Sequence, residues 1–293
     1  MRWVEVSIDA TGESRDAASN ILIEEGCGGT AELDSSASNF GTSKRVSGYL
    51  PVNDTLESRL ANIRSRVREL PAFGLRLASD ELVVKWVQDE DWADGWKKFF
   101  KCVRVGRVVV RPSWEEFVPR PGDVVVGLDP GMAFGTGHHE TTQMCLMALQ
   151  ERLRGGETVL DVGTGSGILS LAAARLGAAR VVGSDVDPVA VEAARANVAS
   201  EHLEGRIQIL QADSPFVFDG EADIVVANII ADVIIAMAEE LRSKVKMGGK
   251  LITSGVIEKR RQEVIWALEA AGLRTVEIKR DCEWVAIVSE RVA

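Results

Sequence analysis

The pattern of apolar and polar residues predicts two folded parts with different architectures. Near the start of the chain, Val4, Val6 and Ile8 alternate with polar residues, as expected for a strand with one buried face. Ser14–Glu25 then predicts a helix, which Gly26 is suited to end. Further short strands are expected at Thr30–Leu33, at Arg45–Leu50, and around Leu82, Val84 and Trp86.

A second helix is expected between the last two of these strands. Leu56, Leu60, Ile63, Val67 and Leu70 recur at intervals of three and four, which forms one apolar stripe on a helix. Asn53 or Asp54 would cap it, and Pro71 would stop it. The resulting order of strand, helix, two strands, helix and strand predicts a ferredoxin-like α+β domain over residues 1–88. No catalytic constellation is found there, so we expect substrate recognition, with a purely stabilising role as the alternative.

Residues 89–102 predict a connecting helix, because acids occupy its first turn and lysines its last. Its aromatic residues share one face, which we interpret as packing between domains. From residue 103 to residue 293, strands alternate with helices, which predicts a doubly wound, Rossmann-like α/β sheet with one antiparallel strand at the end. The expected strands are Arg107–Val110, Val124–Leu128, Thr158–Leu160, Val181–Gly183, Ile207–Leu210, Asp223–Ala227, Lys250–Thr253, Arg274–Lys279 and Trp284–Ser289.

The stretch from Thr158 to Asp187 carries the strongest functional signal. A buried strand leads into the glycine turn Asp161–Gly167, and a helix and a second strand follow. Asp185 comes 22 residues after Gly163, where a carboxylate is placed to accept hydrogen bonds from ribose hydroxyls. The glycine spacing is G-x-G-x-G, and Ile168 stands where a dehydrogenase would have its third glycine. This favours S-adenosylmethionine over NAD; a tight turn that binds nothing is the structural alternative.

Other candidate residues follow the remaining strands. The loop Asp129–Thr142 is rich in Gly and Thr around Phe134, so its backbone is suited to approach a ligand, with the Thr142 hydroxyl at the start of the next helix. Asp213 follows a strand and is placed to meet an adenine amino group. Asn228 also ends a strand, but the Pro-Pro-aromatic sequence typical of adenine and amide methyltransferases is missing after it. An sp³ amine is therefore the favoured substrate, and a strand-end turn residue is the alternative reading of Asn228.

Composition narrows the class of substrate. The net charge is −10 and no Lys/Arg run occurs, which disfavours direct nucleic-acid binding and suits a basic protein substrate. The four cysteines lack C-x-x-C spacing, as expected in a reducing cytosol, and no metal site is expected. No apolar run approaches eighteen residues, so neither a signal peptide nor a membrane span is expected. We expect a cytoplasmic, monomeric enzyme.

The motifs resemble the bacterial ribosomal protein L11 methyltransferases, a family of class I methyltransferases that use S-adenosylmethionine. The resemblance rests on Asp129–Thr142, the glycine turn, Asn228–Ala231 and Asp89–Lys98, and it extends over essentially the whole chain. The loop around Phe134 is its most specific part. The N-terminal domain is the least similar.

The resemblance implies trimethylation of ribosomal protein L11 at its N-terminal α-amine and at lysine ε-amines. It implies that the N-terminal domain grips this substrate, and that Asn228 also faces the target amine. The resemblance implies cofactor contacts for Thr142, Gly163, Asp185 and Asn228; the motifs add Phe134, Gly165 and Asp213.

Three points stay open. His138 or His139 is a candidate proton acceptor, although structural or helix-capping roles are more common for such a pair. A methyltransferase acting on RNA or on a small molecule would share the cofactor half, but not the specific loop. A non-catalytic binding protein would tolerate the loss of Asn228, which is present.

Overall fold

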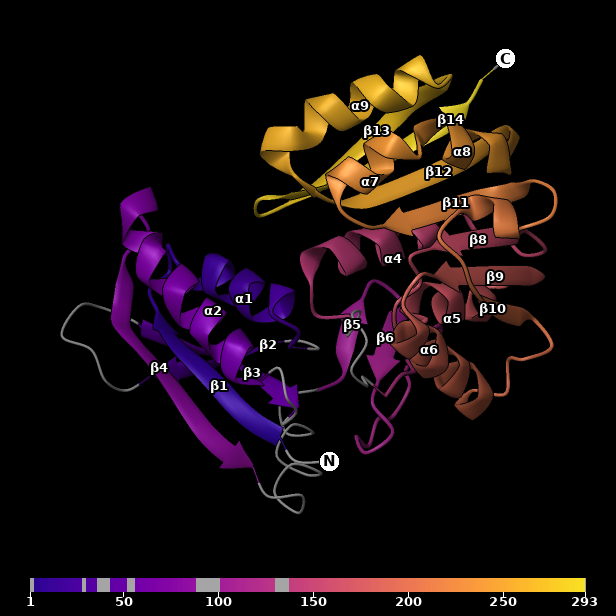
Figure 1. The fold of residues 1–293 in the computed structure, drawn as a ribbon. Helices are drawn as coiled ribbons and strands as arrows, with labels where there is room; N and C mark the ends of the chain where they lie inside the picture. The colour runs from indigo at the N-terminus through magenta and orange to yellow at the C-terminus, as the bar shows by residue number, and fades with distance from the viewer. Residues whose placement is uncertain are drawn as a thin grey trace. The chain divides into compact units, whose positions relative to one another are not determined.

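The computed structural model describes residues 3–27, 30–35, 43–51, 56–87, 101–129 and 137–292. The chain divides into two compact units, Met1–Phe100 and Lys101–Ala293 (Figure 1). Residues 89–100 of the expected connecting helix, the cap at Asn53 or Asp54 and the loop around Phe134 lie outside the described residues, and residues 101 and 102 are not helical.

The first unit has the ferredoxin-like topology that the sequence predicts. Its sheet has the order β2-β3-β1-β4; β1 pairs antiparallel with both β3 and β4, and β2 pairs antiparallel with β3. Helices α1 and α2 connect the strands in split β-α-β fashion (Figure 1). The elements are β1 (Trp3–Ala10), α1 (Arg15–Glu24), β2 (Thr30–Ser35), β3 (Ser43–Pro51), α2 (Leu56–Glu69), a 3₁₀ turn (Leu70–Phe73) and β4 (Leu77–Val87).

The apolar residues that alternate along β1 form part of the core of this unit. Val6 and Ile8 are fully buried and belong to the same apolar cluster as Leu22 of α1 and Ile63 of α2. Strand β4 begins five residues before the predicted Leu82, at Leu77, because its pairing with β1 resumes beyond an irregularity in the register. Local alternation could not reveal that extension.

The second unit contains a main sheet and a separate small sheet (Figure 1). The elements before the glycine turn are β5 (Val103–Val105), β6 (Val108–Arg111), β7 (Val124–Gly127), α4 (Glu140–Arg152) and β8 (Thr158–Val162). Those after it are α5 (Ile168–Arg175), β9 (Arg180–Asp185), α6 (Pro188–Ser200), β10 (Ile207–Gln211), β11 (Ala222–Asn228), α7 (Ala231–Ala236), α8 (Ala238–Lys244), β12 (Val245–Ile257), α9 (Arg261–Ala270), β13 (Leu273–Asp281) and β14 (Trp284–Arg291).

The main sheet is Rossmann-like, with strand order β10-β9-β8-β11-β12-β14-β13. Strands β8 to β12 pair in parallel, and β14 pairs antiparallel with both β12 and β13. The antiparallel strand is therefore the last along the chain, but it lies between two others and not at the edge of the sheet. Strands β6 and β7, predicted before the glycine turn, belong with β5 to the small sheet.

Both faces of the main sheet are covered by helices. In β11, Ile224 and Val226 join a cluster that includes residues of α4, α5 and α6, whereas Val225 and Ala227 join one that includes residues of α7, α8 and α9. Figure 1 shows these last three helices together on one side of the sheet. No helix within the described ranges is long and apolar enough to cross a membrane.

Candidate functional site

The candidate residues gather at the carboxyl ends of neighbouring strands. Strand β8 lies between β9 and β11, and the chain runs outward in opposite directions from this point. Open α/β sheets bind ligands at such a switch point. The glycine turn follows β8, Asp185 ends β9 and Asn228 ends β11, so the sheet itself brings these groups together.

Two glycines determine the backbone conformation of the turn. The Gly163 N–H donates to the Ser184 carbonyl (2.8 Å), and the φ of Gly163 is +73°. A Cβ added at Gly163 would lie 2.4 Å from Cγ2 of Ile229, so a side chain has no room there. Gly165 has a φ of +55°, and its N–H donates to Asp185 Oδ2 (2.9 Å). Glycine is the residue that adopts these values without strain.

Asp185 is partly exposed and keeps acceptor capacity. Its Oδ2 accepts from Gly165, and its Oδ1 accepts from the N–H of Asp187 (3.0 Å). A carboxylate has about four lone-pair positions, so these two bonds leave room for hydroxyl donors. This arrangement fits the ribose-binding role that the sequence predicts.

Asn228 has one paired and one unpaired end of its side-chain amide in the described part of the chain. Its Nδ2 donates to Thr142 Oγ1 (3.3 Å), across 86 residues of sequence. Its Oδ1 is buried and has no hydrogen-bond partner among the residues that the structure describes. An unpaired buried acceptor costs about 1–3 kcal/mol, so a donor supplied by a ligand would be stabilising here.

Asp161 is a buried carboxylate that sequence reasoning treated only as part of the turn. Its Oδ2 accepts from the hydroxyls of Thr164 and Ser170 (2.7 Å each), while Oδ1 is buried without a partner in the described part of the chain. Burial raises the pKa of Asp161 to about 6, an effect that the two hydroxyls oppose and that Asp185 increases. An acid in an otherwise apolar strand was the signal available in the sequence.

Asn197 of α6 was also missed. Its Nδ2 donates to the carbonyl of Ser166 (2.9 Å), and its Oδ1 accepts from the N–H of Asp129 (3.3 Å). The side chain therefore links the glycine turn to the residue that precedes the Phe134 loop. No local pattern distinguishes this Asn from an ordinary helix residue.

Two further predicted site residues are Asp213 and Phe134. Asp213 is exposed and lies two residues beyond the end of β10; the N–H of Ala212 donates to the Asp185 carbonyl (2.9 Å), which holds this segment near the acid. Phe134 lies outside the described residues. Within those residues, no cluster of three or more His, Cys, Asp or Glu side chains is arranged to hold a metal.

His139 acts as a helix cap. Its Nδ1 accepts from the N–H of Thr141 (3.3 Å) at the start of α4, and its ring meets Trp284 edge-on, with centroids 5.0 Å apart. An Nδ1 that accepts this bond carries no proton. The geometry thus favours the capping role over that of a proton acceptor acting through Nδ1.

These groups fit S-adenosylmethionine. The N–H of Gly165 donates to Asp185 and leaves this carboxylate further acceptor capacity, and Oδ1 of Asn228 has no donor among the described residues. Gly163, Gly165 and Thr142 lie at the same edge and would line the methionine end of the cofactor.

Comparisons with known proteins agree with this fit. The family model described as "Ribosomal protein L11 methyltransferase (PrmA)" matches residues 2–292. Curated relatives with that name include a protein of Alkaliphilus oremlandii, 38% identical over 99% of both chains, and one of Pelotomaculum thermopropionicum, 41% identical over 99% of both chains. A crystal structure of ribosomal protein L11 methylase from Lactobacillus delbrueckii subsp. bulgaricus is similar with a TM-score of 0.60 and 30% identity, covering 66% of this chain and 100% of that one.

Proposed function

Because the chain belongs to the ribosomal protein L11 methyltransferase family, whose members depend on S-adenosylmethionine, we propose that it trimethylates amines of ribosomal protein L11. The targets are the N-terminal α-amine and lysine ε-amines. The protein is a methyltransferase of class I fold. Its substrate is a ribosomal protein, so we place its action in the cytoplasm.

The observation that carries the amine chemistry is the buried Oδ1 of Asn228, which no residue in the described ranges pairs with. A carbonyl oxygen accepts an N–H bond, and an amine held in this way can direct its lone pair at the methyl group. S-adenosylmethionine supplies that methyl group in electrophilic form. Asn228 therefore acts by orienting the nucleophile, while Asp185 and the glycine turn hold the cofactor.

The target amine must lose its proton before it reacts. An α-amine, with a reference pKa of about 8, does so easily, whereas a lysine, at about 10.4, costs about 4–5 kcal/mol at pH 7. Burial of the lysine at the site would lower this cost, because desolvation disfavours the charged ammonium. Lysines are therefore the substrates that depend most on the site.

We assign recognition of ribosomal protein L11 to the first unit. Its described residues form a complete apolar core of their own, while the cofactor-binding groups all lie in the second unit. A truncated protein that begins at Lys101 should bind S-adenosylmethionine with near-native affinity but fail to methylate intact ribosomal protein L11.

The decisive experiment is methylation of purified ribosomal protein L11 by the full chain, with methyl groups counted by intact mass spectrometry. Calorimetry with S-adenosylmethionine and with NAD accompanies it, and the protein beginning at Lys101 is the comparison. Methylation of RNA instead of the protein would contradict the proposal. Full activity of the truncated protein would show that residues 1–100 are not needed for recognition.

A further inference from the structure

We propose that Ile230 and Val233 form the surface on which the methylene stem of a target lysine packs, so that they favour methylation of lysine ε-amines and not of the N-terminal α-amine. The inference rests on the proposed function, because it takes amines of ribosomal protein L11 as the methyl acceptors. It adds the residues that distinguish the two kinds of amine.

Both side chains are aliphatic, and both are exposed just beyond Asn228. Ile230 is 64% exposed and Val233 is 38% exposed. Two residues of extended chain span at most about 7 Å, so the backbone of Ile230 lies within that distance of Asn228. The N–H of Val233 donates to the carbonyl of Ile230 (3.1 Å), which places the second side chain one helical turn further on. An aliphatic surface therefore borders the place assigned to the amine.

The backbone on either side of Ile230 is firmly held. Ile229 lies against two glycines: a Cβ added at Gly163 would be 2.4 Å from Cγ2 of Ile229, and one added at Gly255 would be 2.4 Å from its carbonyl oxygen. On the other side, Ile234 of α7 is fully buried. Because its neighbours are fixed, Ile230 keeps its side chain toward the solvent, from which a protein substrate arrives.

The local chemistry of the helix gives no reason for aliphatic residues at these two positions. Ile230 is the N-cap of α7 and Val233 is its third residue, the positions that Ser or Thr and Glu or Gln occupy in a capping box. Isoleucine is among the least favoured N-cap residues, and Ile230 makes no capping bond. Both positions thus lose the stability of a cap and expose apolar surface instead, as expected where function opposes local preference.

A lysine stem is the occupant that fits this surface. Its methylene groups are apolar although its ammonium is charged, and such stems pack along apolar surface. With the amine at Asn228, the stem extends toward the solvent, where Ile230 and Val233 lie. Each methylene group that packs there changes an equilibrium constant roughly fourfold. An N-terminal α-amine is bonded directly to the backbone and has no such stem, so the surface favours lysine alone.

The test replaces both aliphatic residues by residues that a capping box prefers. The full-length variant Ile230→Ser/Val233→Gln removes the apolar surface and supplies both partners of the box, so its thermal stability should equal or exceed that of the wild type. Two forms of ribosomal protein L11 serve as substrates. One has an acetylated α-amine and intact lysines, and the other has a free α-amine and arginines in place of its lysines. The kcat/KM for each form is measured, together with the Kd for S-adenosylmethionine.

We expect kcat/KM on the lysine form to fall roughly tenfold or more, the effect of losing about two packed methylene groups. The kcat/KM on the α-amine form and the Kd for S-adenosylmethionine should stay within about threefold of the wild type. Ile230→Leu, which keeps the apolar surface, should retain most of the rate on lysines.

The matched control is Val276→Gln/Ile278→Ser. These residues are 43% and 37% exposed, but they lie on β13, at the edge of the main sheet. The control variant should leave kcat/KM on both substrate forms unchanged.

Three results would overturn the inference. An unchanged kcat/KM on the lysine form would mean that the stem does not pack on Ile230 and Val233. Equal losses on both forms would make these residues a general contact for the substrate protein. A loss as large in the control variant would remove any special role of this surface. All three leave the proposed function standing, since ribosomal protein L11 is still methylated. A wild-type protein that methylates neither form would contradict the proposed function as well.

Discussion

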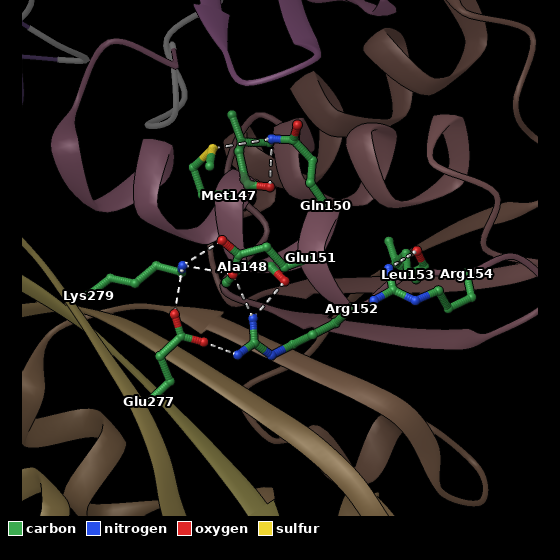
Figure 2. A network of polar contacts seen from close by, with 10 residues as sticks. Met147, Ala148, Gln150, Glu151, Arg152, Leu153, Arg154, Glu277 and Lys279 are labelled. Atoms are coloured by element: carbon green, nitrogen blue, oxygen red, sulfur yellow. Dashed lines mark hydrogen bonds and ion pairs between the residues drawn. The ribbon is translucent and has the colours of Figure 1, made fainter. Parts of the chain in front are cut away.

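The two ends of helix α4 differ in how they meet their surroundings. At the amino end, Thr142 faces Asn228, whose carbonyl oxygen is buried without a partner among the described residues. At the carboxyl end, Arg152 and Glu151 meet charges of opposite sign on β13, Glu277 and Lys279 (Figure 2). One end thus keeps unused capacity for hydrogen bonds, and the other has matched its charges within the protein.

A surface hollow near the carboxyl end of α4 adds to the difference between the two ends. It has a volume of about 410 Å³ and lies where β11 and β12 begin, at the opposite end of β11 from Asn228. Its lining is charged, but Lys246 pairs with Asp223 (2.8 Å) and Lys250 with Glu290 (3.2 Å). Because both lysines of this hollow already have carboxylate partners, they offer little to an anionic ligand. The amino end differs by the buried carbonyl oxygen of Asn228, which has no hydrogen-bond partner among the described residues.

The largest effect is expected from Asn228→Ala. Loss of one orienting acceptor should raise the activation barrier by about 2–4 kcal/mol, which lowers the single-turnover rate by roughly two to three decades. Asn228→Asp should be less damaging, since a carboxylate still accepts an N–H bond. Substrate variants that retain only the α-amine or only the lysines should separate the two targets, with the lysines more affected. Wild-type rates on both would mean that Asn228 does not orient the amine and that the methyl-accepting site lies elsewhere.

Asp161→Asn tests the buried charge at the same end. The unfolded pKa is 3.8 and the folded pKa is about 6, so below pH 3.8 the carboxyl is protonated in both states. As the pH rises through about 6, the folded state must bury the charge and loses about 3 kcal/mol of stability. The wild type should lose this amount relative to Asp161→Asn between pH 4 and pH 7.5, as measured by urea unfolding.

Asp123 provides a control of opposite sign for that experiment. Arg104 lowers the pKa of Asp123 to about 2, with the N–H of Arg120 as a second donor. The stability advantage of the wild type over Asp123→Asn should therefore be present above pH 3.8 and vanish as the pH falls through about 2. Identical pH dependence of the wild type and Asp161→Asn would contradict the assignment of a raised pKa to Asp161.

Asp185→Ala should weaken the binding of S-adenosylmethionine more than it slows methyl transfer. Removing hydrogen bonds to a carboxylate should cost about 1.5–3 kcal/mol of affinity for S-adenosylmethionine, while the rate at saturating cofactor changes little, because such binding is largely uniform. Calorimetry and single-turnover rates measure the two quantities. Unchanged affinity with a collapsed rate would give Asp185 a different role.

The smallest effect is expected at the paired end. A double-mutant cycle with Arg152→Met and Glu277→Gln should give a coupling free energy of about 0.5–1 kcal/mol in urea unfolding, because the Glu277 side chain is 36% exposed and solvent screens the pair. The methylation rate should stay near that of the wild type. A loss of rate as large as that of Asn228→Ala would erase the proposed distinction between the two ends.

The sequence by itself determined the parts that depend on local pattern. The ferredoxin-like order of the first unit and the β8-α5-β9 unit follow from the periodicity of apolar residues, which reports directly on which face of an element is buried. The glycine turn and the place of Asp185 follow from spacing, because a short strand, turn and helix allow few geometries. Asn228 was recognised as a strand-end residue for the same reason.

Tertiary structure decided what depends on residues far apart in the chain. The insertion of β14 between β12 and β13, and the grouping of β6 and β7 in a separate sheet, are matters of strand order, which periodicity does not encode. The side-chain oxygens of Asp161 and Asn228 that lack partners within the described part of the chain are revealed only by its three-dimensional packing. The contact between Thr142 and Asn228 spans 86 residues, so it exists only because the sheet and α4 pack together.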